Sequence, residues 1–143
     1  MEVYSYIFDF HRSPSFFDGW NNNFQVNSMR QDANNFEVVY CTYAPSDIND
    51  CLNGGVLNDD VTIADGGVCN LNLKYEDEIV SVRRDSTFSI GNVVIPLKAV
   101  FIRDKTSKFV LGYSINDTSF DVTNEVKLAE DTIIWSFVDG ESV

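Results

Sequence analysis

Basic residues are scarce in this sequence of 143 residues. Ten lysines and arginines stand against 22 aspartates and glutamates, which gives a formal net charge of -12 at pH 7. The largest basic cluster is the pair Arg83 and Arg84, whereas a protein that follows a phosphate backbone needs several clustered cations. Nucleic acid and anionic membrane surfaces are therefore not expected as partners.

Histidine and closely paired cysteines are scarce too. His11 is the only histidine, and Cys41, Cys51 and Cys69 form no CxxC pair. Because zinc sites need about four nitrogen or sulfur ligands at short spacings, the sequence predicts neither a metal nor a cofactor. We expect reduced, buried thiols in a reducing compartment, and a disulfide between Cys41 and Cys51 stays an open alternative.

Long apolar runs and a leader are also lacking. The longest apolar stretch, residues 93–102, contains Pro96 and Lys98 and is about half as long as a membrane helix. The first residues, MEVYSYIFDFHRS, lack the basic start and uninterrupted apolar core of a secretory signal. We therefore expect a soluble protein that is made in the cytosol and has no membrane partner.

Apolar and polar residues alternate with a period of two along much of the chain. In residues 68–75, for example, Cys69, Leu71, Leu73 and Tyr75 are expected to face inward. Turns are predicted at residues 65–67, 83–86, 104–107, 116–118 and 129–131. This spacing predicts an all-β fold, an antiparallel β-sandwich or jelly-roll-like barrel with an extended aromatic N-terminal segment.

Aromatic residues are concentrated at the amino end. Eight of the 19 lie within the first 24 positions: Tyr4, Tyr6, Phe8, Phe10, Phe16, Phe17, Trp20 and Phe24. The segment could fold back onto its own sandwich, dock on another protein, or stack on a sugar through Trp20 and residues 21–23. We expect a strand and extended arm over residues 1–35, a β-sandwich domain over 36–138 and a polar tail over 139–143.

The most hydrophobic stretch, residues 92–115, predicts a hairpin with arms at 93–103 and 108–115. The arms lack clean alternation, which is typical of strands buried on both faces. The second face could pack on a second layer, a neighbouring subunit or an arm, or the hairpin could be central in the core of one monomer. Pro96 indicates an edge or bulge, and Gly112 a bulge or close backbone approach.

The carboxyl end predicts three short strands, at residues 120–123, 125–129 and 132–138. In the last of them, Ile133, Trp135 and Phe137 share one face, with Ile134 on the other. The large aromatic and aliphatic face is expected to contact the core.

Candidate catalytic groups are weak. Residues 76–78 are all acidic, and paired acids hydrolyse glycosides, but neighbours on a strand point to opposite faces. The run therefore favours a solvated turn. His11 lies near Asp9 and Ser13 without a nucleophile elbow, so no catalytic triad is predicted.

Two groups of side chains offer oxygen ligands for calcium. They are Asp47, Asn49 and Asp50, and Asp59, Asp60 and Asp65. Neither group has the ordered spacing and final glutamate of a calcium loop, which favours turn formation instead.

The block of residues 92–137 contains VVIPLKAVFIRDKTSKFVLGYSI followed by VTNEVKLAEDTIIWSF. It resembles the carboxyl-terminal β-rich portion of small virion structural proteins of tailed bacteriophages, the crAss-like group among them. The resemblance covers about a third of the chain and assigns no functional residues. It implies a protein present in many copies on a capsid, a head fibre or a neck and tail ring.

The sequence therefore predicts a non-enzymatic virion structural protein, made in the host cytoplasm. It is expected to bind other virion proteins and to form a homo-oligomer in a symmetric assembly. The expected contact residues are Tyr4, Tyr6, Phe8, Phe10, Phe16, Phe17, Trp20, Pro96, Phe101 and Phe109. The alternative is a carbohydrate-binding β-sandwich module, and a small hydrolase ranks third.

Overall fold

A computed structural model describes residues 4–5, 8, 10–12, 33–77, 79–106 and 108–136 of the chain. Its elements are β1 (Tyr4–Ser5), β2 (His11–Arg12), β3 (Ala33–Tyr43), α3 (Ile48–Cys51), β4 (Leu52–Asn53), β5 (Val56–Leu57), β6 (Thr62–Glu76), β7 (Ile79–Val82), β8 (Ser86–Asp104), β9 (Val110–Leu128) and β10 (Ile133–Ser136). Strands dominate these residues, which confirms the predicted all-β class. No helix among them is long and apolar enough to span a bilayer.

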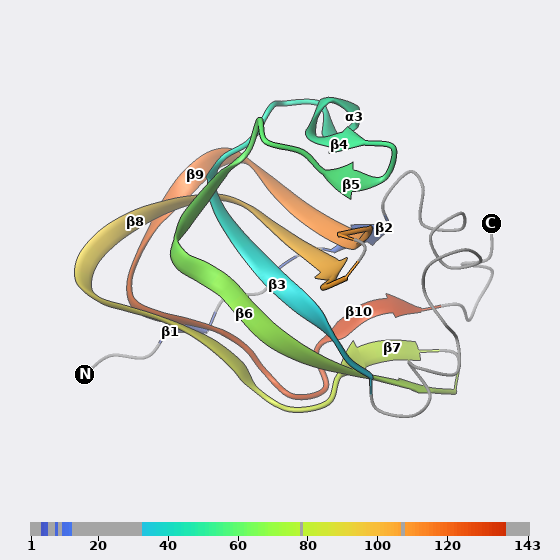
Figure 1. The fold of residues 1–143 in the computed structure, drawn as a ribbon. Helices are drawn as coiled ribbons and strands as arrows, with labels where there is room; N and C mark the ends of the chain where they lie inside the picture. Colours follow the sequence, from blue (N-terminus) through green and yellow to red (C-terminus); the bar gives the residue numbers. More distant parts are fainter. Residues whose placement is uncertain are drawn as a thin grey trace.

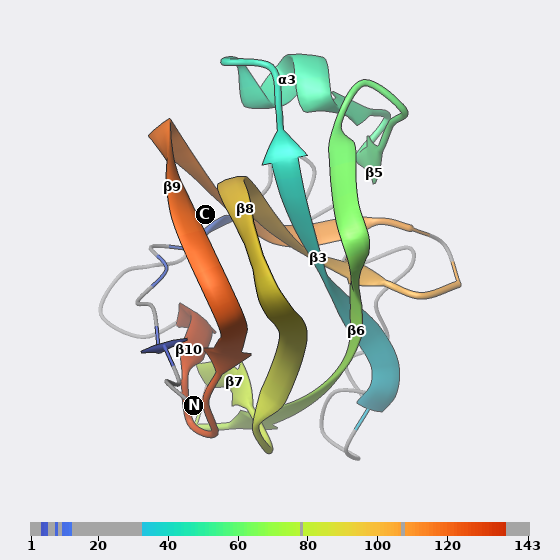
Figure 2. The same cartoon turned by 90° about the vertical axis from the view of Figure 1, so that its left-hand side faces the viewer.

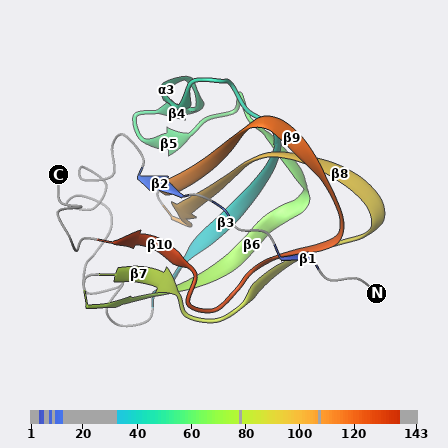
Figure 3. The same ribbon diagram turned by 180° about the vertical axis from the view of Figure 1, so that it is seen from behind.

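Eight strands form one sheet in the order β1-β9-β8-β3-β6-β7-β10, and β2 pairs with β9 as well. The pairings are antiparallel except that of β1 with β9, which is parallel. The sheet curves into a nearly closed barrel (Figure 1, Figure 3). Figure 2 shows β9, β8, β3 and β6 side by side along one wall of this barrel.

The hairpin predicted at residues 65–67 is wrong, because β6 runs through this stretch without reversing. Its pairs with β3 continue on both sides, from Cys41 opposite Ile63 to Val39 opposite Val68. The extra residues between these pairs form a bulge, in which the first glycine has a positive φ of 72°. A bulge bends a strand without ending it, so this glycine pair serves the curvature of the barrel.

β8 and β9 are also longer than predicted. Residues 116–118, predicted as a turn, lie inside β9, which pairs with β8 as a single bent hairpin. The strands predicted at residues 120–123 and 125–129 are therefore parts of one strand. Instead of forming the predicted hairpin around residues 83–86, β7 pairs with β6 and β10, and β8 pairs with β3 and β9.

Three predicted turns are confirmed. The chain reverses between β8 and β9, as predicted at residues 104–107, and turns after β9, as predicted at 129–131. The acidic run at residues 76–78 connects β6 to β7, and Asp77 has the positive φ of 52° that suits a tight turn. The solvated turn expected for this run is thus what the chain forms.

Buried side chains lie on both faces of β3, because successive strand residues point to opposite sides. Phe36, Val38 and Tyr40 belong to the cluster inside the barrel. Val39 and Cys41 belong to a second cluster, completed by Ala44, Cys51, Val61, Ala99, Phe101 and Val110. The segment 44–61, which we call the insert, carries α3, β4 and β5 and covers this outer cluster (Figure 1).

The carboxyl half of β8 is therefore covered on both faces, as predicted. Val100 and Ile102 belong to the barrel cluster, whereas Ala99 and Phe101 belong to the cluster beneath the insert. Of the open alternatives, the second layer is the one found, and this chain supplies it through its own insert. Burial on two faces explains why the run lacks alternation.

The amino-terminal segment folds back onto the barrel at the positions described. β1 pairs with β9 at Val126 and Lys127, and β2 pairs with the other end of β9, at Gly112 and Tyr113. Between them Phe8 and Phe10 are buried in the barrel cluster, and Phe8 lies 6.5 Å from the ring of Tyr40. Of the strand and arm predicted over residues 1–35, residues 13–32 lie outside the described residues, as does the tail over 139–143.

Two single-residue predictions have clear outcomes. A Cβ atom on Gly112 would lie 3.2 Å from the carbonyl oxygen of His11, which confirms the predicted close backbone approach. The face predicted for the last strand is wrong, because Ile134 is buried while Ile133 is 54% exposed. A register shift between Ile133 and Trp135 in the pairing with β7 accounts for the change of face.

Candidate interaction surface

Two bulges create an outward bend in the β8–β9 hairpin. On β8, residues 92–94 stand opposite the single residue Thr123, and on β9 residues 116–119 stand opposite Lys98. Pro96 lies in the same region, where β8 pairs with β9 and the pairs with β3 have not yet begun. The predicted edge or bulge at this proline is confirmed. We call residues 89–96 of β8 and 115–125 of β9 the bend (Figure 1).

Two valines on the bend face solvent. Val93 and Val94 are 59% and 62% exposed, the highest fractions among the large hydrophobic side chains described. Pro96 is exposed beside them, whereas Ile95 packs against the barrel cluster and fixes the direction of its neighbours. Scattered exposed apolar residues are common on proteins, whereas contiguous apolar patches mark contact surfaces, and here the exposed residues are neighbours.

A cavity of about 280 Å³ adjoins the valines. Its lining consists of Ser89, Gly91, Asn92, Asn124 and Glu125. Gly91 and Asn124 pair across the strands and have positive φ values of 86° and 68°, so the cavity results from the bulge itself. The lining offers amide, hydroxyl and carboxylate groups, which can both donate and accept hydrogen bonds.

The charge of the bend has one sign. Its carboxylates are Asp117, Asp121 and Glu125, and it contains no lysine or arginine. Asp121 stands directly opposite Pro96 in the ladder. The adjoining Lys98 donates from Nζ to the carbonyl oxygen of Asp117 at 2.7 Å, which ties the bulge of β9 to β8.

Polar contacts also hold the other end of the bent hairpin. The Asp85 carboxylate accepts the backbone N–H of Glu130 at 2.7 Å and lies 3.6 Å from the Lys127 ammonium. The hydrogen bond from Glu130, aided by Lys127, holds the pKa of the Asp85 carboxyl below its usual range. The acid is therefore ionised at neutral pH.

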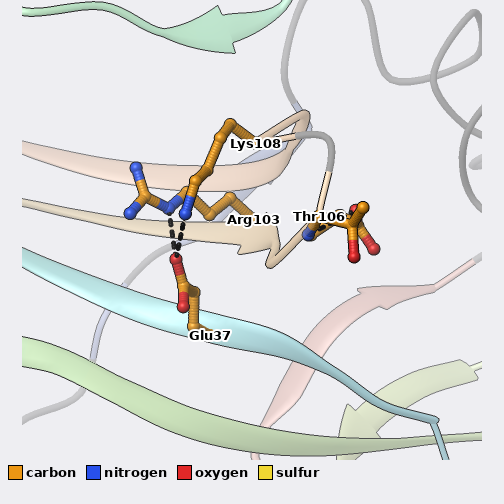
Figure 4. A network of polar contacts seen from close by, with 5 residues as sticks. Glu37, Arg103, Thr106 and Lys108 are labelled. Atoms are coloured by element: carbon orange, nitrogen blue, oxygen red, sulfur yellow. Dashed lines mark hydrogen bonds and ion pairs between the residues drawn. The ribbon is translucent and has the colours of Figure 1, made fainter.

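A buried ion pair secures the covered half of β8 (Figure 4). Glu37 of β3 stands opposite Arg103, whose Nε lies 2.7 Å from Oε2 of Glu37, and Nζ of Lys108 lies 3.5 Å from the same oxygen. In the adjoining turn, the N–H of Thr106 donates to Oδ2 of Asp104 at 3.0 Å. Because the two cations lie against the same carboxylate oxygen, this cluster links β3 to both ends of the β8–β9 turn.

The three cysteines are free thiols. Burial raises the pKa of Cys41 to about 12, with Arg103 acting against the rise and Cys51 adding to it. Burial raises the pKa of Cys51 to about 11, and Asp50, Asp47 and Asp60 add to it. The thiolate is the reactive form, so both groups are inert at neutral pH.

The structure separates the predicted contact residues. Tyr6, Phe16, Phe17 and Trp20 lie outside the described residues, as does the side chain of Tyr4. Phe8, Phe10 and Phe101 are buried in the core of this chain, which corrects their assignment, because such side chains present no surface to a partner. Phe109 is half-buried against the barrel cluster, and Pro96 is exposed on the bend.

The other candidate groups have local structural contacts. Oδ1 of Asp47 accepts the N–H of Asn49 at 2.9 Å and caps α3, which is the turn-forming role expected for it. The ring of His11 lies 5.6 Å from that of Tyr113. Within the part of the chain that is described, no group of three metal-ligating side chains comes together. The proposed sugar contact at Trp20 and residues 21–23 lies outside that part.

Comparisons with protein-family models, with curated proteins and with solved structures give no match. The bend therefore carries the functional argument. Val93, Val94 and Asn124 were not among the residues predicted for contacts. The signal that points to the two valines is their position between Gly91 and Pro96, since both of these residues interrupt a regular ladder.

Proposed function

We propose that this protein is a non-enzymatic structural component of a virion, which acts by binding other virion proteins through the bend. The observation that supports this proposal is the exposure of Val93 and Val94 on β8, which pairs with β9 directly before them at Gly91 and directly after them at Ile95. A fixed apolar patch needs no ordering when a partner arrives, so less conformational entropy is lost on binding.

The composition of the bend fits a protein contact. Interfaces combine an apolar centre with a polar rim, and here Val93, Val94 and Pro96 adjoin a polar cavity. A small-molecule site usually encloses most of its ligand, whereas the valines project outward. A second contact through the aromatic amino-terminal segment, and a symmetric homo-oligomer, stay predictions from the sequence.

Particle composition tests the virion role. Virus particles purified from the producing host should contain this chain in a fixed ratio to the major capsid protein, as measured by quantitative mass spectrometry. An abundant host protein serves as the control for carry-over. If the chain is absent, or present only at the level of that control, the proposed function is wrong.

A matched pair of variants tests the role of the bend. Val94→Asp should lower incorporation into particles by about tenfold, because it places a charge at the apolar centre of the contact. Val68→Asp replaces another exposed valine, 42% exposed on β6, and should leave incorporation unchanged. Equal incorporation of both variants would show that the contact lies elsewhere.

A further inference from the structure

We infer that the bend binds an extended segment of a different protein chain, in which an apolar side chain is flanked by lysine or arginine. This inference rests on the proposed function and specifies the chemistry of the partner. It follows from three properties of the bend: a stretch of backbone outside the regular ladder, exposed apolar side chains and acidic charge.

The backbone of the β8 bulge favours an extended partner. The ladder between β8 and β9 passes from Gly91 to Ile95, and the pairs of β8 with β3 begin at Ala99. In the described chain, residues 92–94 thus lie outside the one-to-one ladder, with Thr123 of β9 opposite them and no pair with β3. Another extended chain can hydrogen-bond such a backbone and place alternate side chains on either face, as in strand addition.

The side chains of the bend determine which residue types the partner segment must contain. Val93 and Val94 provide the apolar contact, and the neighbouring cavity presents Asn92, Asn124 and Glu125. A lysine or arginine next to an apolar residue would reach the Glu125 carboxylate while its neighbour covers the valines. Asp121 lies opposite Pro96 and provides a second carboxylate at the other end of the patch.

Among the described residues, no ion pair is formed by Asp117, Asp121 or Glu125 with the two lysines nearest to the bend in the sequence. Lys98 is engaged with the carbonyl oxygen of Asp117, and Lys127 lies beside Asp85. The bend itself carries a charge of -3 from Asp117, Asp121 and Glu125, and the adjoining Lys98 lowers the local excess to -2, in a chain whose net charge is -12. Complementary charge on the partner raises the rate of association and excludes acidic partners.

The same charge disfavours a second copy of this chain as the occupant. Two bends packed face to face would bring their carboxylates together at an interface of low dielectric constant, where like charges repel strongly. A symmetric contact through the bend would also need basic residues within it, and the bend has none. The partner is therefore a chain of different sequence.

Binding of three defined peptides tests the inference. The probes are octapeptides in which valine alternates with lysine, with glutamine or with glutamate. Backbone amide shifts of the full chain are followed during each titration. The lysine peptide should bind about tenfold more tightly than the glutamine peptide, shift residues 89–95 and 115–125, and weaken as salt is added. The glutamate peptide should cause no shift.

Two double variants with the same change in net charge distinguish a local contact of the peptide with the bend from attraction to the negative charge of the whole protein. Asp121→Lys combined with Glu125→Lys should weaken the lysine peptide by about tenfold. Asp59→Lys combined with Asp60→Lys changes the net charge equally on the exposed insert and should leave binding within about twofold. Val94→Ser should weaken binding, and Val68→Ser should not. A urea titration of each variant verifies that the fold is retained, and Val93→Ser replaces Val94→Ser if that variant unfolds.

The outcomes separate this inference from the proposed function. Equal binding of the lysine and glutamate peptides, equal loss in both double variants, or shifts confined to other residues overturns the inference. Self-association of the chain that Val94→Ser abolishes also overturns it, but leaves the proposed assembly role intact. Absence of the chain from purified particles overturns the virion role, whatever the peptides do.

Discussion

Both halves of β8 contain apolar residues, but they differ in how much of them is exposed to solvent. Its carboxyl half, from Leu97 to Asp104, is almost entirely buried, whereas residues 91–94 in its amino half are exposed. The carboxyl half lies between the barrel interior and the insert, whereas residues 91–94 pair with no strand other than β9 and have no layer over them in the described chain. An apolar strand sequence thus indicates that the strand is stabilised by burial, but which part of it is buried depends on where the other segments of the chain pack.

The difference also separates stability from binding. Side chains beneath the insert lose their water when the chain folds, so they contribute to the free energy of unfolding. Val93 and Val94 keep most of their contact with water after folding, and their burial free energy stays available for a partner. The following four predictions test this division, from the largest expected effect on stability to the smallest.

Phe101→Ala in the covered half should lower the free energy of unfolding by about 3–5 kcal/mol, because it leaves a cavity between the sheet and the insert. Val94→Ala in the exposed half of the same strand should change it by less than about 0.5 kcal/mol. Urea unfolding followed by tryptophan fluorescence measures both. Similar losses of unfolding free energy for the two variants would show that the two halves of β8 contribute equally to stability.

Arg103→Met should lower the free energy of unfolding by about 3 kcal/mol, because it leaves Glu37 buried, with the exposed Lys108 as its remaining cation among the described residues. Combining it with Glu37→Met removes the stranded charge and should restore most of that loss. The same urea titration gives both values as a double-mutant cycle. A single-variant cost below about 1 kcal/mol would mean that water reaches the pair.

Alkaline pH should weaken the covered region through Cys41. Burial raises the pKa of this thiol from 9.0 to about 12, so the folded chain keeps a proton that the unfolded chain releases above pH 9. The stabilising effect is complete below about pH 9 and falls as pH rises toward 12. Between pH 8 and pH 10 the loss is about 1 kcal/mol. Cys41→Ala should remove this part of the pH dependence, and an unchanged slope would contradict the assignment.

Tyr40→Phe should raise the free energy of unfolding by about 1 kcal/mol, because the Tyr40 hydroxyl is buried without a hydrogen-bond partner among the described residues. Its ring still stacks on Phe88, at 5.0 Å between centroids. Tyr43→Phe, on a side chain that is 56% exposed, is the matched control and should change little. Thermal unfolding by circular dichroism detects the difference, and a loss of stability would indicate a hidden partner.

The buried residues of a strand were predictable from the period of two where one face of the strand is buried and the other is exposed along its whole length. In β6, Leu71 and Leu73 are buried while Val68 is exposed, as the period of two predicts. In β10 the same rule gave the wrong face, because a shift in pairing with β7 turns Ile134 inward. The alternation rule assumes a regular ladder, and a bulge breaks that assumption.

Glycines that favour a turn are visible in the sequence, but they do not show whether the chain reverses or only bends. Gly66 and Gly91 adopt positive φ, as turn residues do, yet both lie in bulges of continuous strands. Whether such a residue ends a strand depends on the partner strand, which is encoded far away. The ion pair of Glu37 with Arg103 joins residues 66 positions apart and was likewise invisible to local patterns.

The way the amino-terminal segment docks has a consequence for synthesis. β1 and β2 pair with β9, which begins at Val110, so Tyr4 cannot take its place until its partner Val126 has been synthesised. Until then Phe8 and Phe10 lack the barrel interior that buries them. Pairings so distant along the chain slow folding, because the long loop between the partners must close first.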